Sequence, residues 1–137
     1  MKLRSLWVLA FFLVLACSAD QPPLTAEQLQ IARPLPGMSM GAGYLTLKNN
    51  SAQQIRITQV HSPDLKSVEM HESALEDGVS RMYKLQEVVI LPGQSTSFEP
   101  GAKHLMLRYP DTIPDQVTLQ FYAEETLLLS VSATLKD

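Results

Sequence analysis

Cysteine is almost absent from this sequence. The single cysteine, Cys17, directly follows a segment with the character of a cleaved signal peptide. Whether Cys17 is lipid-modified or removed, the folded part of the chain holds no free thiol. The sequence therefore excludes disulfide bonds, thiolate zinc sites, cysteine nucleophiles and blue-copper electron-transfer centres, which need a cysteine beside two histidines.

Positive charge is also scarce. The chain has 11 Lys and Arg residues against 14 Asp and Glu residues. Loss of residues 1–16 would remove Lys2 and Arg4, leaving nine basic against fourteen acidic residues, a net charge of −5. Because phosphate binding needs a concentrated basic surface, we expect no nucleic-acid partner. No Ser-His-Asp arrangement or phosphate-cradling glycine loop is visible, so we expect no enzyme.

The sequence begins with an apolar run that is too short to span a bilayer as a helix. This run, Leu6 to Ala16, has eleven residues and follows the basic residues Lys2 and Arg4. A short basic region followed by a short apolar core predicts a signal peptide over residues 1–16.

The residues before the cysteine resemble a bacterial lipobox. They read Val14-Leu15-Ala16-Cys17, which implies that Cys17 is lipidated and holds the protein stably on the membrane. Ser18, rather than an aspartate, favours the outer membrane, and the domain would face the periplasm. The alternative is a secretory signal cut after Ala19, which would release a soluble periplasmic protein.

Long segments with helical periodicity are missing, and the remainder reads as one all-β domain. Turn signals such as Asp77-Gly78 and Pro92-Gly93 separate short apolar stretches. The expected strands are 29–32, 43–48, 55–61, 65–71, 80–85, 87–91, 95–99, 102–109, 116–123 and 127–135. This pattern predicts a cupredoxin-like or immunoglobulin-like antiparallel Greek-key sandwich over residues 29–137, behind a tether over residues 17–28. The capping-box spacing of residues 25–28 allows a helical turn there.

Side-chain alternation singles out two histidines and two methionines. Residues two apart in a strand share a face. In the stretch 102–109 the apolar row is Leu105, Leu107 and Tyr109, which leaves His104 and Met106 on the outer face.

The same reasoning places two more candidates outside the core. His71 lies opposite in parity to Met70, which we interpret as a core residue in step with Val68. Met82 lies opposite in parity to the apolar pair Tyr83 and Leu85. A single histidine is ordinarily a hydrogen-bonded polar residue and a methionine a core filler, but the alternation places Met82 and Met106 outside the core.

His71, Met82, His104 and Met106 together form a soft donor set. Imidazole and thioether ligands favour monovalent copper over harder ions such as Zn(II). The spacing, His followed after ten residues by Met and after 21 more by His-x-Met, predicts a site for one Cu(I) per chain. Met38 and Met40, in a glycine-rich stretch, are either auxiliary thioether donors or loop hydrophobes.

This spacing resembles that of the periplasmic copper chaperones called PCu(A)C. The likeness extends to Gly43-Tyr44-Leu45-Thr46-Leu47-Lys48-Asn49 and to Leu91-Pro92-Gly93, and it covers the chain from about Ile31 onward. The resemblance implies a cupredoxin-like sandwich, Cu(I) bound by the four residues above, and delivery of copper toward the dinuclear copper centre of a haem-copper oxidase.

The partner implied by this resemblance is an oxidase subunit or an assembly factor, and we expect the chaperone to be a monomer. Two other hypotheses remain open. One is a copper-resistance or storage lipoprotein that uses the same site. The other is a metal-free sandwich that serves as a scaffold or adhesion lipoprotein.

Overall fold

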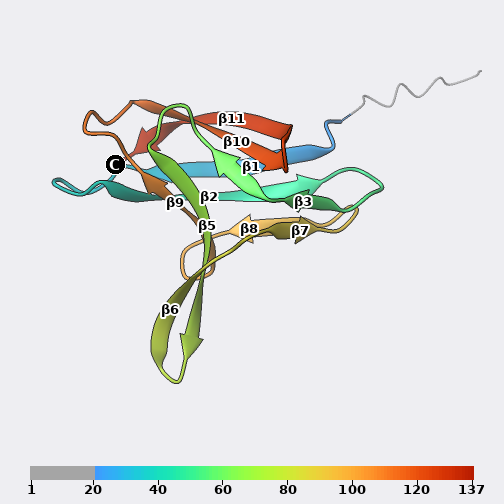
Figure 1. Ribbon diagram of the computed structural model, residues 1–137, viewed down its shortest axis with the longest axis horizontal. Coiled ribbons are helices and arrows are strands. Elements are labelled where there is room, and N and C mark those ends of the chain that lie inside the picture. The colour runs from blue at the N-terminus through green and yellow to red at the C-terminus, as the bar shows by residue number, and fades with distance from the viewer. Residues whose placement is uncertain (1–20) are drawn as a thin grey trace, which may run out of the picture.

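The computed structural model describes residues 21–137, and these residues form strands without any helix. The strands are β1 (Leu24–Ala32), β2 (Met40–Asn49), β3 (Ile55–Ile57), β4 (Gln59–His61), β5 (Ser67–Glu76), β6 (Val79–Lys84), β7 (Val88–Ile90), β8 (Ser95–Phe98), β9 (Lys103–Arg108), β10 (Gln116–Ala123) and β11 (Thr126–Lys136). Their arrangement is drawn in Figure 1.

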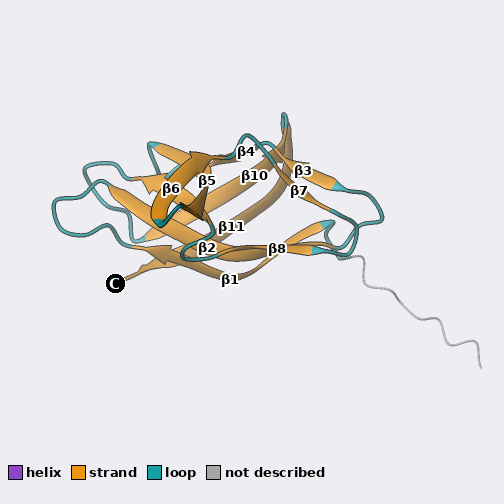
Figure 2. Cartoon of the chain, turned by 90° about the horizontal axis from the view of Figure 1, so that it is seen from below, coloured by secondary structure: helices purple, strands orange, loops and turns teal. Residues whose placement is uncertain are grey.

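The strands form a two-layered sandwich, which confirms the predicted fold class. The main sheet has the order β4-β10-β11-β1-β2-β9-β5-β6, with β8 also paired to β2, and β3 pairs with β7 in a second sheet. Figure 2 shows β1, β2 and β8 along one side and β3, β4, β7 and β10 along the other. The pairing of β1 with β11 is parallel, so the sheet is mixed rather than wholly antiparallel. These are the first and last strands, and no hairpin turn constrains their relative direction.

Alternating side chains fill one continuous core. In β10, Val117, Leu119 and Phe121 are fully buried, while the residues between them reach the opposite face. One polar side chain, Asn49, lies inside this core. Its amide group donates hydrogen bonds of 2.7 Å and 2.9 Å to the backbone carbonyls of Gln53 and Ile90, which ties β2 to β7. The buried amide is therefore satisfied rather than costly.

A close contact between β2 and the end of β9 requires a glycine. A Cβ atom on Gly41 would lie 2.8 Å from the ring of Tyr109 and 2.9 Å from the carbonyl oxygen of Ala32. The Tyr109 hydroxyl donates a 3.0 Å hydrogen bond to that same carbonyl, and burial raises the pKa of Tyr109 to about 12. The phenol consequently stays protonated, and its hydrogen bond ties the end of β9 to the end of β1.

One predicted strand is divided in the structure. The expected single strand over 55–61 is divided at Thr58, whose backbone amide donates to Tyr122 and whose hydroxyl accepts from the Glu124 amide. Its two halves therefore belong to different sheets, β3 with β7 and β4 with β10.

The amino-terminal end of the sandwich also lies earlier than expected. β1 begins at Leu24, which is fully buried, so the residues from Leu24 belong to the sandwich and not to a tether. The helical turn allowed by the sequence is replaced by an irregular strand with a register shift between Glu27 and Gln30 and a positive φ of 55° at Gln28. The predicted signal peptide and Cys17 lie outside the described residues. Residues 21–137 contain no helix of the length and apolarity that crossing a bilayer requires.

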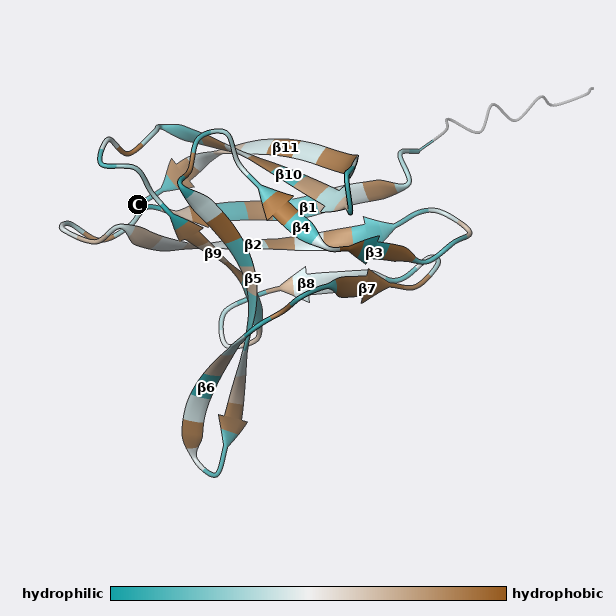
Figure 3. Ribbon diagram, viewed as in Figure 1, coloured by the Kyte–Doolittle hydropathy of each residue, from teal (hydrophilic) through white to brown (hydrophobic). Residues whose placement is uncertain are grey.

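The hairpin formed by β5 and β6 extends away from the sandwich (Figure 1). Every residue of β6 is exposed, although apolar residues recur along it (Figure 3). Tyr83, predicted to face the core, is 45% exposed, and its hydroxyl donates a 2.6 Å hydrogen bond to Glu76. Its parity is the expected one, but no second layer covers this part of the hairpin.

Candidate metal centre

β9 carries two of the four predicted ligands on one face. It lies between β2 and β5 in the main sheet. Leu105 and Leu107 are fully buried in the core, whereas Met106 is partly exposed on the other face beside His104. The alternation predicted for this strand is therefore the one that the structure shows.

His104 is held in a defined orientation. Its Nδ1–H donates a 3.0 Å hydrogen bond to the carbonyl oxygen of Ala102, because a carbonyl can only accept. The proton on Nδ1 leaves the lone pair of Nε2 free to act as a ligand. With only 9% of the residue exposed, the ring has little freedom to turn.

His71 lies directly opposite His104 in the pairing of β5 with β9. The two ring centroids are 5.9 Å apart and the ring planes are inclined by 35°. His71 Nε2–H donates a 2.9 Å hydrogen bond to Glu69. Its Nδ1 is buried and has no hydrogen-bond partner among the described residues. A buried lone pair without a donor is unusual in a folded protein and suits a metal ligand.

An ion pair fixes the carboxylate that orients His71. Lys84 donates a 2.8 Å hydrogen bond to the second oxygen of Glu69. The hydrogen bond from Lys84, and after it the one from His71, holds the pKa of Glu69 below its ordinary value. The carboxylate therefore remains an acceptor for the His71 ring near neutral pH.

Met82 comes from the projecting hairpin. It pairs with Ser73, two residues beyond His71 on the same face of β5, and it is 53% exposed. Met82 lines an open cavity of about 570 Å³ that His104 and Met106 also line. We call this cavity the thioether hollow. His71 does not line it, but its ring lies beside the ring of His104, which does.

The donor chemistry of this face matches Cu(I). The structure places all four predicted residues on one face of β6, β5 and β9, offering two imidazole nitrogens and two thioethers. Within residues 21–137 there is no cluster of three or more His, Cys, Asp or Glu side chains that could hold a metal ion. A harder cation that prefers oxygen, or zinc with its nitrogen and thiolate preference, finds no comparable set there.

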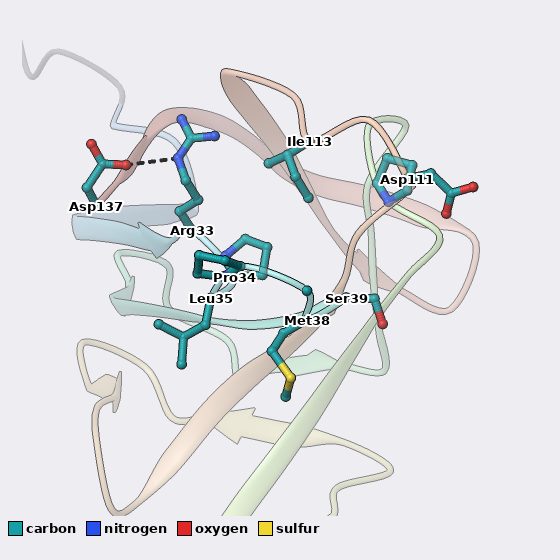
Figure 4. A pocket seen from close by; sticks show the side chains of 11 residues that line it. Arg33, Pro34, Leu35, Met38, Ser39, Asp111, Ile113 and Asp137 are labelled. Atoms are coloured by element: carbon teal, nitrogen blue, oxygen red, sulfur yellow. Dashed lines mark hydrogen bonds and ion pairs between the residues drawn. The ribbon is translucent and has the colours of Figure 1, made fainter.

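Of the two methionines left open by the sequence, only one lies at the site. Met40 lines the thioether hollow, whereas Met38 lines a separate cavity of about 670 Å³. Figure 4 shows that second cavity, with Leu35, Met38 and Ile113 around it and Arg33 bonded to Asp137 at its rim. The pairing of β2 with β9 decides which methionine is close, and that pairing could not be read from the sequence alone.

Comparisons with known proteins agree with this fold. The model of the LpqE-like lipoprotein family matches residues 19–133. The uncharacterized protein RP573 of Rickettsia prowazekii is 28% identical over 74 residues, which are 53% of this chain and 41% of that protein. The chain therefore spans less than half the length of this curated relative.

Several solved structures share the architecture. A copper-bound PCuAC domain from PmoF2 has a TM-score of 0.65 at 18% identity and covers 83% of this chain and 92% of that domain. Apo-DR1885 from Deinococcus radiodurans has a TM-score of 0.57 at 22% identity, over 99% of this chain and 93% of that one. The chain has the fold of a PCuAC domain, and the predicted resemblance is confirmed at that level.

Proposed function

Because the chain belongs to the LpqE-like lipoprotein family and has the fold of a PCuAC domain, we propose that it is a copper chaperone of the bacterial envelope. In this proposal it carries one Cu(I) on His71, Met82, His104 and Met106. It is a carrier and not an enzyme, since the metal is its cargo.

One observation above all supports the proposal. Two facing histidines, 5.9 Å apart, each keep one ring nitrogen free by giving the other ring proton to a fixed acceptor. One of these nitrogens, Nδ1 of His71, is buried and has no hydrogen-bond partner within residues 21–137. A metal ion bound between the rings would satisfy both lone pairs, and the neighbouring thioethers would select the soft Cu(I) ion.

The gradient of exposure across the site suits transfer. The imidazoles are nearly buried, whereas Met82 on the hairpin is largely exposed. The ligands of an acceptor protein can therefore approach from the hairpin side and replace Met82 first, before the histidines release the ion. Thioethers carry no proton, so this exchange needs no proton transfer.

The test is metal binding by the purified full chain. We expect one Cu(I) per chain in a competition titration, and X-ray absorption should report two nitrogen and two sulfur donors. A site with nitrogen and oxygen donors alone, or a preference for zinc, would refute the assignment. Absence of any metal binding would instead favour the scaffold or adhesion hypothesis.

We further propose that the cargo goes to the dinuclear copper centre of a haem-copper oxidase, directly or through an assembly factor. Deleting the gene in its own bacterium should lower the copper content of that centre. Wild-type protein should restore it and the His104→Ala variant should not. If deletion leaves the oxidase intact but makes the cells sensitive to copper, the protein serves resistance or storage.

The proposed location rests on Cys17. Membership of a lipoprotein family supports a location in the cell envelope. We propose that Cys17, which follows the lipobox-like residues, is the residue that carries the lipid anchor. We expect the wild-type protein to sediment with membranes and to take up a lipid label, and Cys17→Ala should prevent both. Recovery of wild-type protein as an unlipidated soluble species beginning at Asp20 would contradict the anchor.

A further inference from the structure

Met40 occupies the first position of β2, next to the predicted ligands. Ala42 pairs with Met106, and Met40 pairs with Arg108 two residues further along β9. Residues two apart share a face, so Met40 lies on the same face as Met106, as its diagonal neighbour. Diagonal pairs across antiparallel strands lie within reach of long side chains.

The surroundings of Met40 support this placement. Met40 lines the thioether hollow together with Met82, His104 and Met106. It also shares a smaller cavity of about 170 Å³ with Met106 and Glu69. The next residue, Gly41, takes the core-facing position against Tyr109, so Met40 does not serve as core filling.

Met40 and Met82 differ in how they are held. Met82 comes from an exposed strand of the projecting hairpin, whereas Met40 comes from the end of β2 that pairs with β9 in the main sheet. An acceptor that displaces Met82 therefore leaves Met40 in place. The hollow thus holds one more thioether on the side of the sandwich, in addition to Met106.

We propose that Met40 is a further thioether ligand, which takes the place of Met82 on Cu(I) when the hairpin thioether is displaced. This inference rests on the proposed function. In the exchange, the sulfur of Met40 donates a lone pair to copper as the dative bond from Met82 breaks. Copper remains monovalent, and no proton moves. The protein thereby keeps four ligands of its own on the cargo while the hairpin thioether is released.

Leucine substitutions test this role because they remove the sulfur and keep an apolar side chain of similar volume. The full chain and its variants Met40→Leu, Met82→Leu and the double variant are titrated with Cu(I) against a competing chelator. We expect each single variant to bind less than about tenfold more weakly, and the double variant to lose more than the product of the two single effects. Met38→Leu is the matched control and should bind like wild type, because Met38 lines a different cavity.

X-ray absorption of the single variant Met82→Leu gives a second measurement that does not depend on the double variant. We expect two sulfur donors, as in wild type, because Met40 replaces the missing thioether. One sulfur donor in this variant, or a double variant that binds like Met82→Leu, would overturn the inference while leaving the proposed function intact. If wild-type protein binds no Cu(I), the proposed function fails, and this inference fails with it.

Discussion

The sandwich and the projecting hairpin both contribute residues to the candidate site, but these residues differ in how far they are exposed. In the sandwich, His104 is almost buried and its ring is bonded to the backbone. On the hairpin, Met82 lies on a strand whose residues are all exposed. The buried histidine is therefore suited to selecting the ion, whereas the exposed methionine is suited to contact with a partner.

Residues of the same strand parity also differ in burial between the sandwich and the hairpin. Met70 and Tyr83 both have the parity of core residues. Met70 packs in the core of the sandwich and is 4% exposed, whereas Tyr83 lies on the projecting hairpin and is 45% exposed. Parity decides the face of a strand, but only an opposing layer turns that face into core.

The largest expected effect tests this difference directly. Met70→Ala should lower the free energy of unfolding by roughly 2–5 kcal/mol, the usual cost of truncating a buried methionine. Tyr83→Ala should change it by only about 0.5 kcal/mol, because the ring packs against no core. Urea denaturation of the two variants measures both values. Equal losses would show that the hairpin is packed in solution.

A smaller effect is expected where the sandwich is tightest. Gly41→Ala places a methyl group 2.8 Å from the Tyr109 ring and 2.9 Å from a backbone carbonyl oxygen. The strain should cost about 1–3 kcal/mol. Gly43→Ala is the matched control, since its new methyl group would meet Leu105 at an ordinary 3.4 Å. The thermal unfolding midpoints of the two variants should therefore differ clearly, and similar midpoints would mean that β2 shifts to make room.

The third effect separates ligand chemistry from folding. Met82→Leu should change the stability of the metal-free protein by no more than about 0.5 kcal/mol, since the side chain is exposed on the hairpin. Met106→Leu keeps the side-chain volume on the outer face of β9 and should also be mild, within about 1.5 kcal/mol. Both should weaken Cu(I) binding, whereas Met70→Leu should leave it unchanged. If Met70→Leu weakened Cu(I) binding, the assignment of Met70 to the core face of β5 and of His71 to the outer face would be wrong.

The alternation of side chains along single strands was enough to predict which face each of these residues occupies. The opposite faces of Met70 and His71, and of Leu105 and Met106, follow from a period of two that any strand obeys. The class of fold followed from short apolar stretches separated by turn residues. These inferences need only neighbours in the sequence, and the structure agrees with them.

What the sequence could not predict depends on which strands are neighbours. The nearness of Met40 to Met106 depends on the register of β2 against β9, which is a long-range property. The projection of the hairpin depends on how far β5 extends beyond its neighbour β9. The buried Nδ1 of His71 depends on a hydrogen bond from the same ring to Glu69, two residues away on the same face.

The smallest expected effect concerns the ion pair that joins the two strands of the hairpin at its base. Lys84 on β6 bonds to Glu69 on β5, and this bond is the largest cause of the lowered pKa of Glu69. Because the carboxyl pKa is lower in the folded state, its stabilising contribution is present above the ordinary value near 4.5 and is lost as the pH falls through the lowered pKa. Lys84→Gln should therefore raise the pKa of Glu69, measured by carboxyl carbon NMR. At neutral pH it should cost no more than about 1 kcal/mol, because the pair is partly exposed. A carboxyl pKa that does not move in Lys84→Gln would show that Lys84 does not hold Glu69 in solution, and that His71 alone fixes the carboxylate.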